Sequence, residues 1–162
     1  MKGDIYSHAV GVERTPDGRR LTVSRVVDAP ADAVWRLLVD TTRWPEWGPT
    51  VAAVDSPTRF VADGTRGRLQ VAGVGVWVPF TVDAVEESEG TRRWTWTVAR
   101  LPATGHRVDA LDGRCRVTFE VPVLAAGYVP VCRRALDRIA RLVDAVEGET
   151  DVDDRETDGD RQ

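Results

Sequence analysis

His106 is the residue of this sequence that is best suited to move a proton. An imidazole titrates close to neutral pH, so it can act as a general acid or base, or donate a hydrogen bond to a ligand. A buried, neutral histidine that bonds to the backbone or to water fits the same pattern. The spacing supplies no obvious carboxylate partner, because Glu120 falls on the opposite strand parity and Glu46 fits a solvated helix residue. The catalytic residue is therefore unknown, with His106 as the best candidate.

The segment that follows His106 indicates which way its side chain points. An Asp-Gly pair at residues 112–113 predicts a two-residue turn of type I′ between two strands. In that register His106 faces Phe119, and Val108 lies on the same apolar face of the hairpin. His106 is therefore expected to point into the protein, whereas a register shift of one residue would turn it outward.

The sequence contains six tryptophans, which is a high number for 162 residues. Trp94 and Trp96 alternate with threonines in a predicted strand, so both are expected on its inner face. An indole ring offers a ligand both apolar surface and one N–H donor, although core packing uses the same residues. Trp94 and Trp96 therefore fit either a ligand-binding role or a role in core packing.

Several other kinds of site are not expected. The two cysteines, Cys115 and Cys132, have no Cys-x-x-Cys spacing and are interpreted as small buried groups with free thiols. No histidine or cysteine motif of a metal site occurs, so we expect no metal and no cofactor. Gly73 and Gly75 lack the third glycine of a dinucleotide-binding loop. Arginines are spread along the chain and balanced by acidic residues, so nucleic-acid binding is not expected either.

The elements that must position these residues follow from periodicity and turn signals. A strand is predicted at Leu21–Val27, and two short linked helical segments follow it. The later predicted strands are Thr50–Asp55, Arg66–Val71, Trp77–Val85, Arg92–Arg100, Gly105–Leu111 and Arg114–Val121. A long amphipathic helix is predicted after Pro130, with an apolar stripe that includes Val131, Ala135 and Ile139.

Three short motifs lie after the first predicted strand. They are Asp28-Ala29-Pro30, Val34-Trp35 and Trp44-Pro45-Glu46-Trp47. Together with the order of the elements, they resemble the START-like helix-grip superfamily (SRPBCC), in particular its polyketide cyclase/dehydrase and lipid-transport branch. The resemblance covers about residues 20–146. It implies an α+β helix-grip fold, in which a seven-stranded curved antiparallel sheet surrounds the long C-terminal helix and the two short helices close one end.

The resemblance also implies a cavity between the sheet and the C-terminal helix, which binds a small hydrophobic or aromatic ligand. The candidate ligand-binding residues are Trp47, Trp94, Trp96, His106, Val108 and Phe119. Two alternatives stay open. One is a cofactor-independent cyclase or dehydratase that acts on a polyketide-like substrate, with His106 moving a proton. The other is a protein-interaction or chaperone module.

Charge is distributed unevenly along the chain. The net charge is −4, but residues 147–162 hold eight acidic residues against two arginines, so the rest of the chain carries about +2. Residues 148–162 contain almost nothing to bury and are predicted to form an acidic disordered tail after a single domain at residues 1–147. No apolar run has the length of a membrane-spanning helix and no signal peptide is recognised, so a cytoplasmic protein without stable membrane insertion is expected. The oligomeric state is not predicted.

Overall fold

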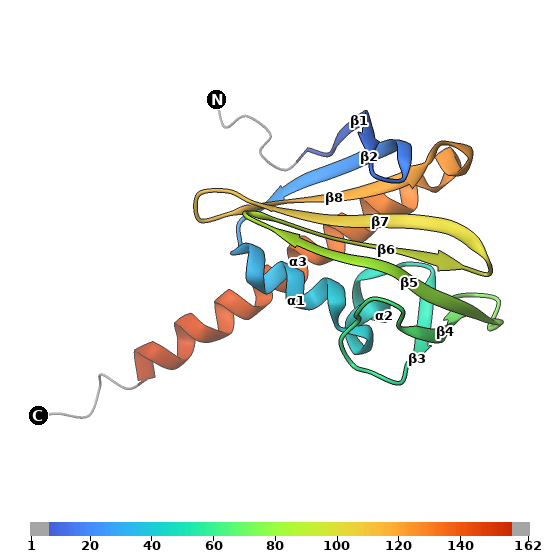
Figure 1. Ribbon diagram of the computed structural model, residues 1–162. Coiled ribbons are helices and arrows are strands. Elements are labelled where there is room, and N and C mark those ends of the chain that lie inside the picture. Colours follow the sequence, from blue (N-terminus) through green and yellow to red (C-terminus); the bar gives the residue numbers. More distant parts are fainter. Residues whose placement is uncertain (1–6, 157–162) are drawn as a thin grey trace, which may run out of the picture.

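One antiparallel sheet, in the strand order β1-β2-β8-β7-β6-β5-β4-β3, lies against a long C-terminal helix (Figure 1). The structure is a computed structural model that describes residues 7–156, with side chains described through residue 145. The strands are β1 (Ala9–Thr15), β2 (Gly18–Val27), β3 (Val51–Asp55), β4 (Arg66–Val71), β5 (Trp77–Ser88), β6 (Thr91–Val98), β7 (Leu101–Ala110) and β8 (Cys115–Pro122). The helices are α1 (Ala31–Val39), η1 (Thr41–Arg43), α2 (Trp44–Trp47), η2 (Val123–Tyr128) and α3 (Val129–Glu156).

The α+β helix-grip fold is confirmed, with one difference in the sheet. The sequence analysis predicts seven strands, and all seven are present as β2 to β8. The eighth strand, β1, pairs with β2 across a tight turn at residues 16–17 and forms an edge of the sheet. Most of its side chains are exposed, including Val10 and Val12, so β1 has no buried face whose alternation could reveal it in the sequence.

Helix α3 crosses the inner face of the sheet and supplies much of the core (Figure 1). Leu136 and Ile139 are fully buried and belong to the same apolar cluster as Val23 of β2 and Val117 of β8. The predicted stripe on this helix is thus present. An isolated amphipathic helix is only marginally stable in water. Packing of the apolar stripe against the sheet removes its surface from water and so stabilises the helix.

The register of the β7–β8 hairpin agrees with the prediction from the sequence. His106 pairs with Phe119 and Val108 with Val117, so His106 points toward the inner face as expected. The type of turn was predicted wrongly. Gly113 has a φ of +69°, but Asp112 does not have a positive φ, and a type I′ turn requires one at both positions.

Helix α3 extends to Glu156 and so includes residues 148–156 of the predicted acidic tail. Residues 157–162 lie outside the described residues. The division into a domain and a tail therefore stays a prediction. Among the described helices, none is both long and apolar enough to span a membrane.

Asp40 lies between α1 and η1, at the C-terminal cap of the first and the N-terminal cap of the second. Helix α2, with its two tryptophans, follows η1 directly. Its carboxylate accepts hydrogen bonds from the Thr42 backbone N–H (3.0 Å) and from Nε and Nη2 of Arg59 (3.0 and 2.9 Å), and it is 3% exposed. Burial raises the pKa of Asp40, but the bonds from Arg59 and Thr42 together outweigh burial and hold the pKa below its ordinary value.

Replacing Asp40 with Asn is expected to destabilise the protein by about 1 kcal/mol at pH 7, because Arg59 loses its charged acceptor. A carboxyl whose pKa is lowered by folding stabilises the protein above its unfolded pKa of about 3.9 and loses that effect as the pH falls further. Urea unfolding of both proteins at pH 7 and pH 3 measures the difference. A gap between the two proteins that stays the same at pH 3 would contradict this role.

Candidate functional site

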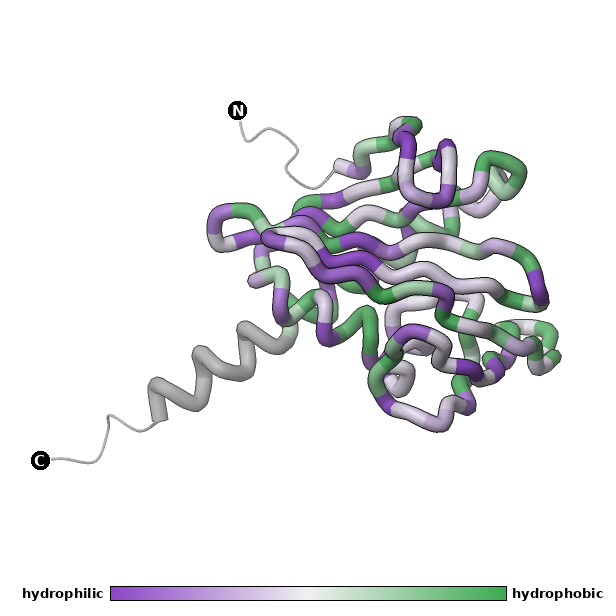
Figure 2. The backbone as a smooth tube through the Cα atoms, in the orientation of Figure 1, coloured by the Kyte–Doolittle hydropathy of each residue, from purple (hydrophilic) through white to green (hydrophobic). Residues whose placement is uncertain are grey.

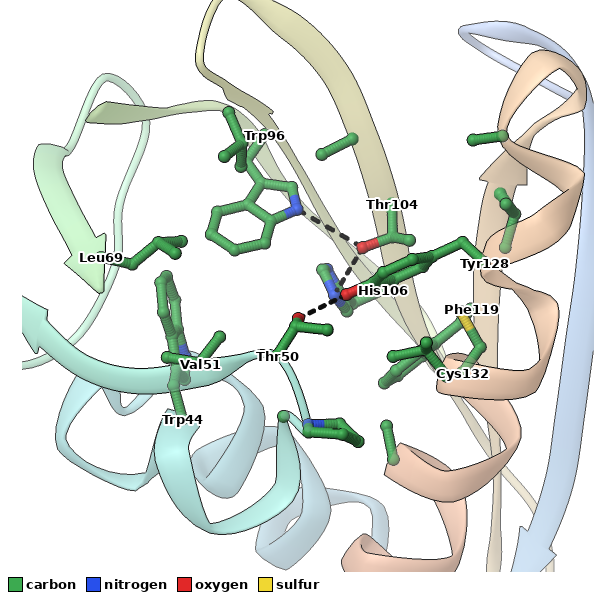
Figure 3. Close-up of a pocket in the computed structure, with 18 of the residues that line it drawn as sticks. Trp44, Thr50, Val51, Leu69, Trp96, Thr104, His106, Phe119, Tyr128 and Cys132 are labelled. Atoms are coloured by element: carbon green, nitrogen blue, oxygen red, sulfur yellow. Dashed lines mark hydrogen bonds between the residues drawn. The ribbon is translucent and has the colours of Figure 1, made fainter. Parts of the chain in front are cut away.

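A cavity of about 300 Å³ lies between the inner face of the sheet, the α2–β3 segment and α3 (Figure 3). Its walls come from α2 and the loop after it, from the ends of strands β4 to β8, and from η2 and the first turns of α3. This volume is at the lower end of the range for small-molecule sites. The position is the one that the sequence analysis expects, between the sheet and the C-terminal helix.

Helix α2 brings two tryptophans into the wall of this cavity. Trp44 and Trp47 are three residues apart, so both lie on one face of the short helix. The indole N–H of Trp44 donates to the carbonyl of Leu38 (2.9 Å), and that of Trp47 donates to the carbonyl of Leu37 (3.2 Å). These bonds satisfy carbonyls at the C-terminal end of α1 and fix α2 against it. Both rings are therefore held in place before any ligand arrives.

The wall of the cavity carries no charge at neutral pH. None of the residues that line it is Asp, Glu, Lys or Arg, and its titratable groups are His106, Tyr128 and Cys132. Burial lowers the pKa of His106 to about 3 and raises that of Cys132 to about 12. Burial also raises the pKa of Tyr128. All three shifts favour the neutral form, so the site offers an incoming ion no opposite charge.

His106 lies in an aromatic box and is only 1% exposed. Its ring stacks on Trp94, with the ring centroids 4.0 Å apart, and meets the edges of Phe119 (4.9 Å) and Trp47 (5.8 Å). Burial is the main reason for its low pKa. An interaction with the Trp94 backbone raises the pKa but is outweighed, and the positive charge of Arg93 lowers it further. The imidazole is thus a neutral, weakly basic group.

A short polar chain crosses the wall of the cavity at β6 and β7 (Figure 3). The indole N–H of Trp96 donates to Thr104 Oγ1 (3.4 Å), which lies 3.1 Å from His106 Nε2. In the tautomer with the imidazole proton on Nδ1, the Thr104 hydroxyl accepts from Trp96 and donates its own proton to Nε2. Nδ1 makes no hydrogen bond of ordinary geometry with the described residues. In that tautomer Thr104 keeps one lone pair available to a ligand, and in the other it keeps its hydroxyl proton.

A second polar contact bridges the cavity on another side. The hydroxyl groups of Thr50, after α2, and Tyr128, at the end of η2, lie 2.6 Å apart (Figure 3). The sequence analysis assigned no role to either residue. Thr50 is the first residue of a predicted strand and Tyr128 precedes the predicted long helix, and no turn signal links the two segments as one links His106 to Phe119. The contact ties η2 to the α2–β3 segment across the cavity.

The six predicted ligand-binding residues divide into two groups. Trp47, Trp96, His106 and Phe119 line the cavity, whereas Trp94 and Val108 do not. Trp94 is completely buried behind the wall, because its ring stacks on Trp44 at 5.3 Å with an interplanar angle of 5° and on His106.

Glu46, the other candidate for proton transfer, is not part of the cavity wall. It pairs with Arg43 on the exposed side of α2. This is the solvated helix residue that the sequence analysis considered. Among the described residues, His106 is therefore not joined by a carboxylate in the wall.

An open antiparallel sheet that curves around a long C-terminal helix, with an apolar cavity between them, defines the helix-grip class of START-like proteins. The chain belongs to the family described as polyketide cyclase / dehydrase and lipid transport, whose sequence profile matches residues 18–144. The expected family is thus confirmed.

Solved structures share the fold at low sequence identity. A hypothetical protein from Helicobacter pylori, jhp0584, has a TM-score of 0.61 and 14% identity, over 75% of this chain and 85% of that one. Protein Ms6760 from Mycobacterium smegmatis has a TM-score of 0.59 and 20% identity, over 85% and 99%. The Zhui aromatase/cyclase from Streptomyces sp. R1128 has a TM-score of 0.53 and 15% identity, over 76% and 92%. No curated protein matches the sequence.

Proposed function

We propose that the protein binds an uncharged, hydrophobic or aromatic small molecule in the cavity between the sheet and α3. The observation that carries this proposal is the wall itself, which is apolar and has no charged side chain, with its three titratable groups shifted toward their neutral forms. A charged ligand would lose its hydration without gaining a partner. An apolar ligand gains about 25 cal/mol for each Å² of its surface that leaves water.

The polar groups of the wall set the orientation of the ligand rather than its affinity. Thr104, supported by Trp96 and His106, presents a hydroxyl oxygen on one side. The hydroxyls of Thr50 and Tyr128 lie on another. A flat ligand with one or two carbonyl or hydroxyl groups matches this arrangement of a few polar groups in an apolar pocket.

A cyclase or dehydratase activity on a polyketide-like substrate is the second candidate. Family membership supports it, together with structural neighbours described as the aromatase/cyclases Zhui and BexL. The chain from Trp96 through Thr104 to His106 could position a substrate oxygen. However, a base whose pKa is about 3 accepts a proton poorly at pH 7, which favours binding over proton transfer by His106.

Replacing Val98 with Trp is expected to fill part of the cavity and weaken ligand binding by at least about tenfold. A ligand gains roughly 0.8 kcal/mol for each methylene-sized part that it buries, so the loss of room for two such parts is sufficient. The probe is N-phenyl-1-naphthylamine, an uncharged aromatic molecule whose fluorescence rises in apolar sites. The matched control is Val12→Trp in the exposed part of β1, which should bind the probe as the original protein does. Equal binding by both variants would contradict the location of the site.

The two candidate functions differ in what they require of His106. Native mass spectrometry of gently purified protein, followed by organic extraction, identifies any retained molecule. If the protein is a binder, His106→Gln should weaken binding of that molecule only a few-fold, and the molecule should be recovered unchanged. If it is an enzyme, the molecule should be converted, with a rate that falls by at least about 100-fold in the variant.

A further inference from the structure

Three loops meet at one end of the molecule, around the mouth of the cavity. They are the β4–β5 turn, the β6–β7 turn and the η2 segment after β8, all on the right in Figure 1. Residues at the base of each loop line the cavity: Val71 and Val78, Val98 and Pro102, and Pro122. The loops therefore form the rim of the proposed ligand cavity.

Hydrophobic residues, green in Figure 2, make up much of these three loops. The five large apolar side chains that the rim exposes are Val74 (71%), Val76 (53%), Leu101 (69%), Val123 (52%) and Leu124 (103%). They come from all three loops. Single exposed apolar residues are ordinary, but a group gathered around a cavity mouth indicates a surface that another body covers.

Within the three rim segments themselves, the charge has one sign. Residues 69–82, 94–105 and 121–132 contain no Asp or Glu, and their single charged residue is Arg100, at the tip of the β6–β7 turn. Arg133 and Arg134 follow directly in the first turns of α3, and both are exposed. The three rim segments thus carry only cations, while Asp17 and Asp83, which line a hollow with Pro102 and Ala103, are bound by Arg93 and Thr97. Guanidinium groups bind phosphate strongly and in a bidentate manner.

We propose that this end of the protein docks onto a lipid surface with anionic headgroups. The side chains of Leu101, Leu124 and Val74 would enter the boundary of the acyl chains, and Arg100 would contact headgroup phosphates. The mouth of the cavity then faces the bilayer, so a hydrophobic ligand passes between membrane and cavity without crossing water. This inference rests on the proposed function, since the docked end matters through the cavity that it surrounds.

The test is flotation of the full chain with vesicles of phosphatidylcholine alone, or of an equimolar mixture with phosphatidylglycerol. The protein is expected to float with the anionic vesicles and to be released at high salt. The double variant Leu101→Glu with Leu124→Glu should lose at least about 30-fold in vesicle affinity, since two buried leucines are replaced by charges. The matched control is Val10→Glu with Val12→Glu, an equally exposed apolar pair on β1, and should float normally.

Two measurements separate this proposal from the proposed function. The rim variant should still bind N-phenyl-1-naphthylamine, whereas Val98→Trp should lose the probe and still float. Arg100→Gln should weaken binding to anionic vesicles a few-fold and leave any binding to neutral vesicles unchanged. Failure of the original protein to float with either vesicle would overturn the proposal. A dimer that the rim variant abolishes, without vesicle binding, would show instead that a second copy covers this end.

Discussion

Acidification from pH 6.5 toward pH 3 is expected to cost the protein about 1.4 kcal/mol of stability per pH unit through His106 alone. Its pKa is about 3 in the folded protein and close to 6.5 in an unfolded chain. Between pH 6.5 and pH 3, His106 binds a proton in the unfolded chain but stays unprotonated in the folded protein. The contribution of His106 is therefore complete above pH 6.5 and is lost as the pH falls through this range.

The physical reason is the aromatic box around the imidazole. A protonated ring has an N–H group on each nitrogen, and among the described residues only Thr104, beside Nε2, is placed to accept from one of them, while Trp94 covers one ring face. Arg93 adds a like charge nearby. Because small proteins are stable by only about 5–15 kcal/mol, the loss of about 3 kcal/mol that this one group causes by pH 4 is a large share of the total.

Two measurements check this expectation. Urea unfolding at pH 7, 6 and 5 gives the slope of stability against pH, and His106→Gln should remove most of that slope, whatever its own stability at pH 7. The ring proton resonances of His106 should also stay constant between pH 7.5 and pH 5. A titration of those resonances near pH 6.5 would show that the ring is accessible to protons in the folded state.

Replacing Arg93 with Met is expected to destabilise the protein by roughly 3–5 kcal/mol at pH 7, which is the usual cost of leaving a buried ion without its partner. The partner is Glu120, which is 1% exposed. Nε of Arg93 donates to both oxygens of that carboxylate, at 3.2 and 2.9 Å, and Nη1 of Arg107 contributes a longer bond of 3.3 Å. With Arg93 gone, only the longer bond remains.

A double-mutant cycle isolates the coupling between these two residues. The combined variant Arg93→Met with Glu120→Leu should be more stable than Arg93→Met alone, because no buried charge is left over. Arg92→Met is the matched control, as Arg92 pairs with Asp32 at the surface and its loss should cost no more than about 1 kcal/mol. Strictly additive effects of Arg93→Met and Glu120→Leu would show that the pair is not coupled.

The part of the site that the sequence predicts correctly depends on local patterns. The Asp-Gly turn and the alternation of the next strand were sufficient to place His106 opposite Phe119 and on the inner face. Alternation reports which face of a sheet a side chain occupies, but not how deep it lies. For this reason Trp94 and Trp96 looked equivalent, although Trp96 touches the cavity and Trp94 is buried behind it.

The rest of the site depends on contacts between distant segments. Glu120 reaches Arg93 by passing over Gly105, where an added Cβ would lie 2.5 Å from Glu120 Oε2. Nothing in the local sequence indicates that this glycine makes room for an ion pair. The bond between Thr50 and Tyr128 joins residues 78 positions apart in two irregular segments, and periodicity does not predict such a contact.

The alternation of β6 has a consequence for how such a protein can evolve. Arg93 belongs to the ion network on the outer face, and its neighbour Trp94 belongs to the aromatic cluster on the inner face. An insertion of one residue between them would exchange these two environments unless a bulge absorbed it, as the register shift between Val82 and Ala84 of β5 does. The three loops at the rim are free of that constraint. Insertions and deletions at the tips of these loops can alter which ligands enter and which surfaces are recognised, while the part of the cavity wall that the sheet and α3 form is kept.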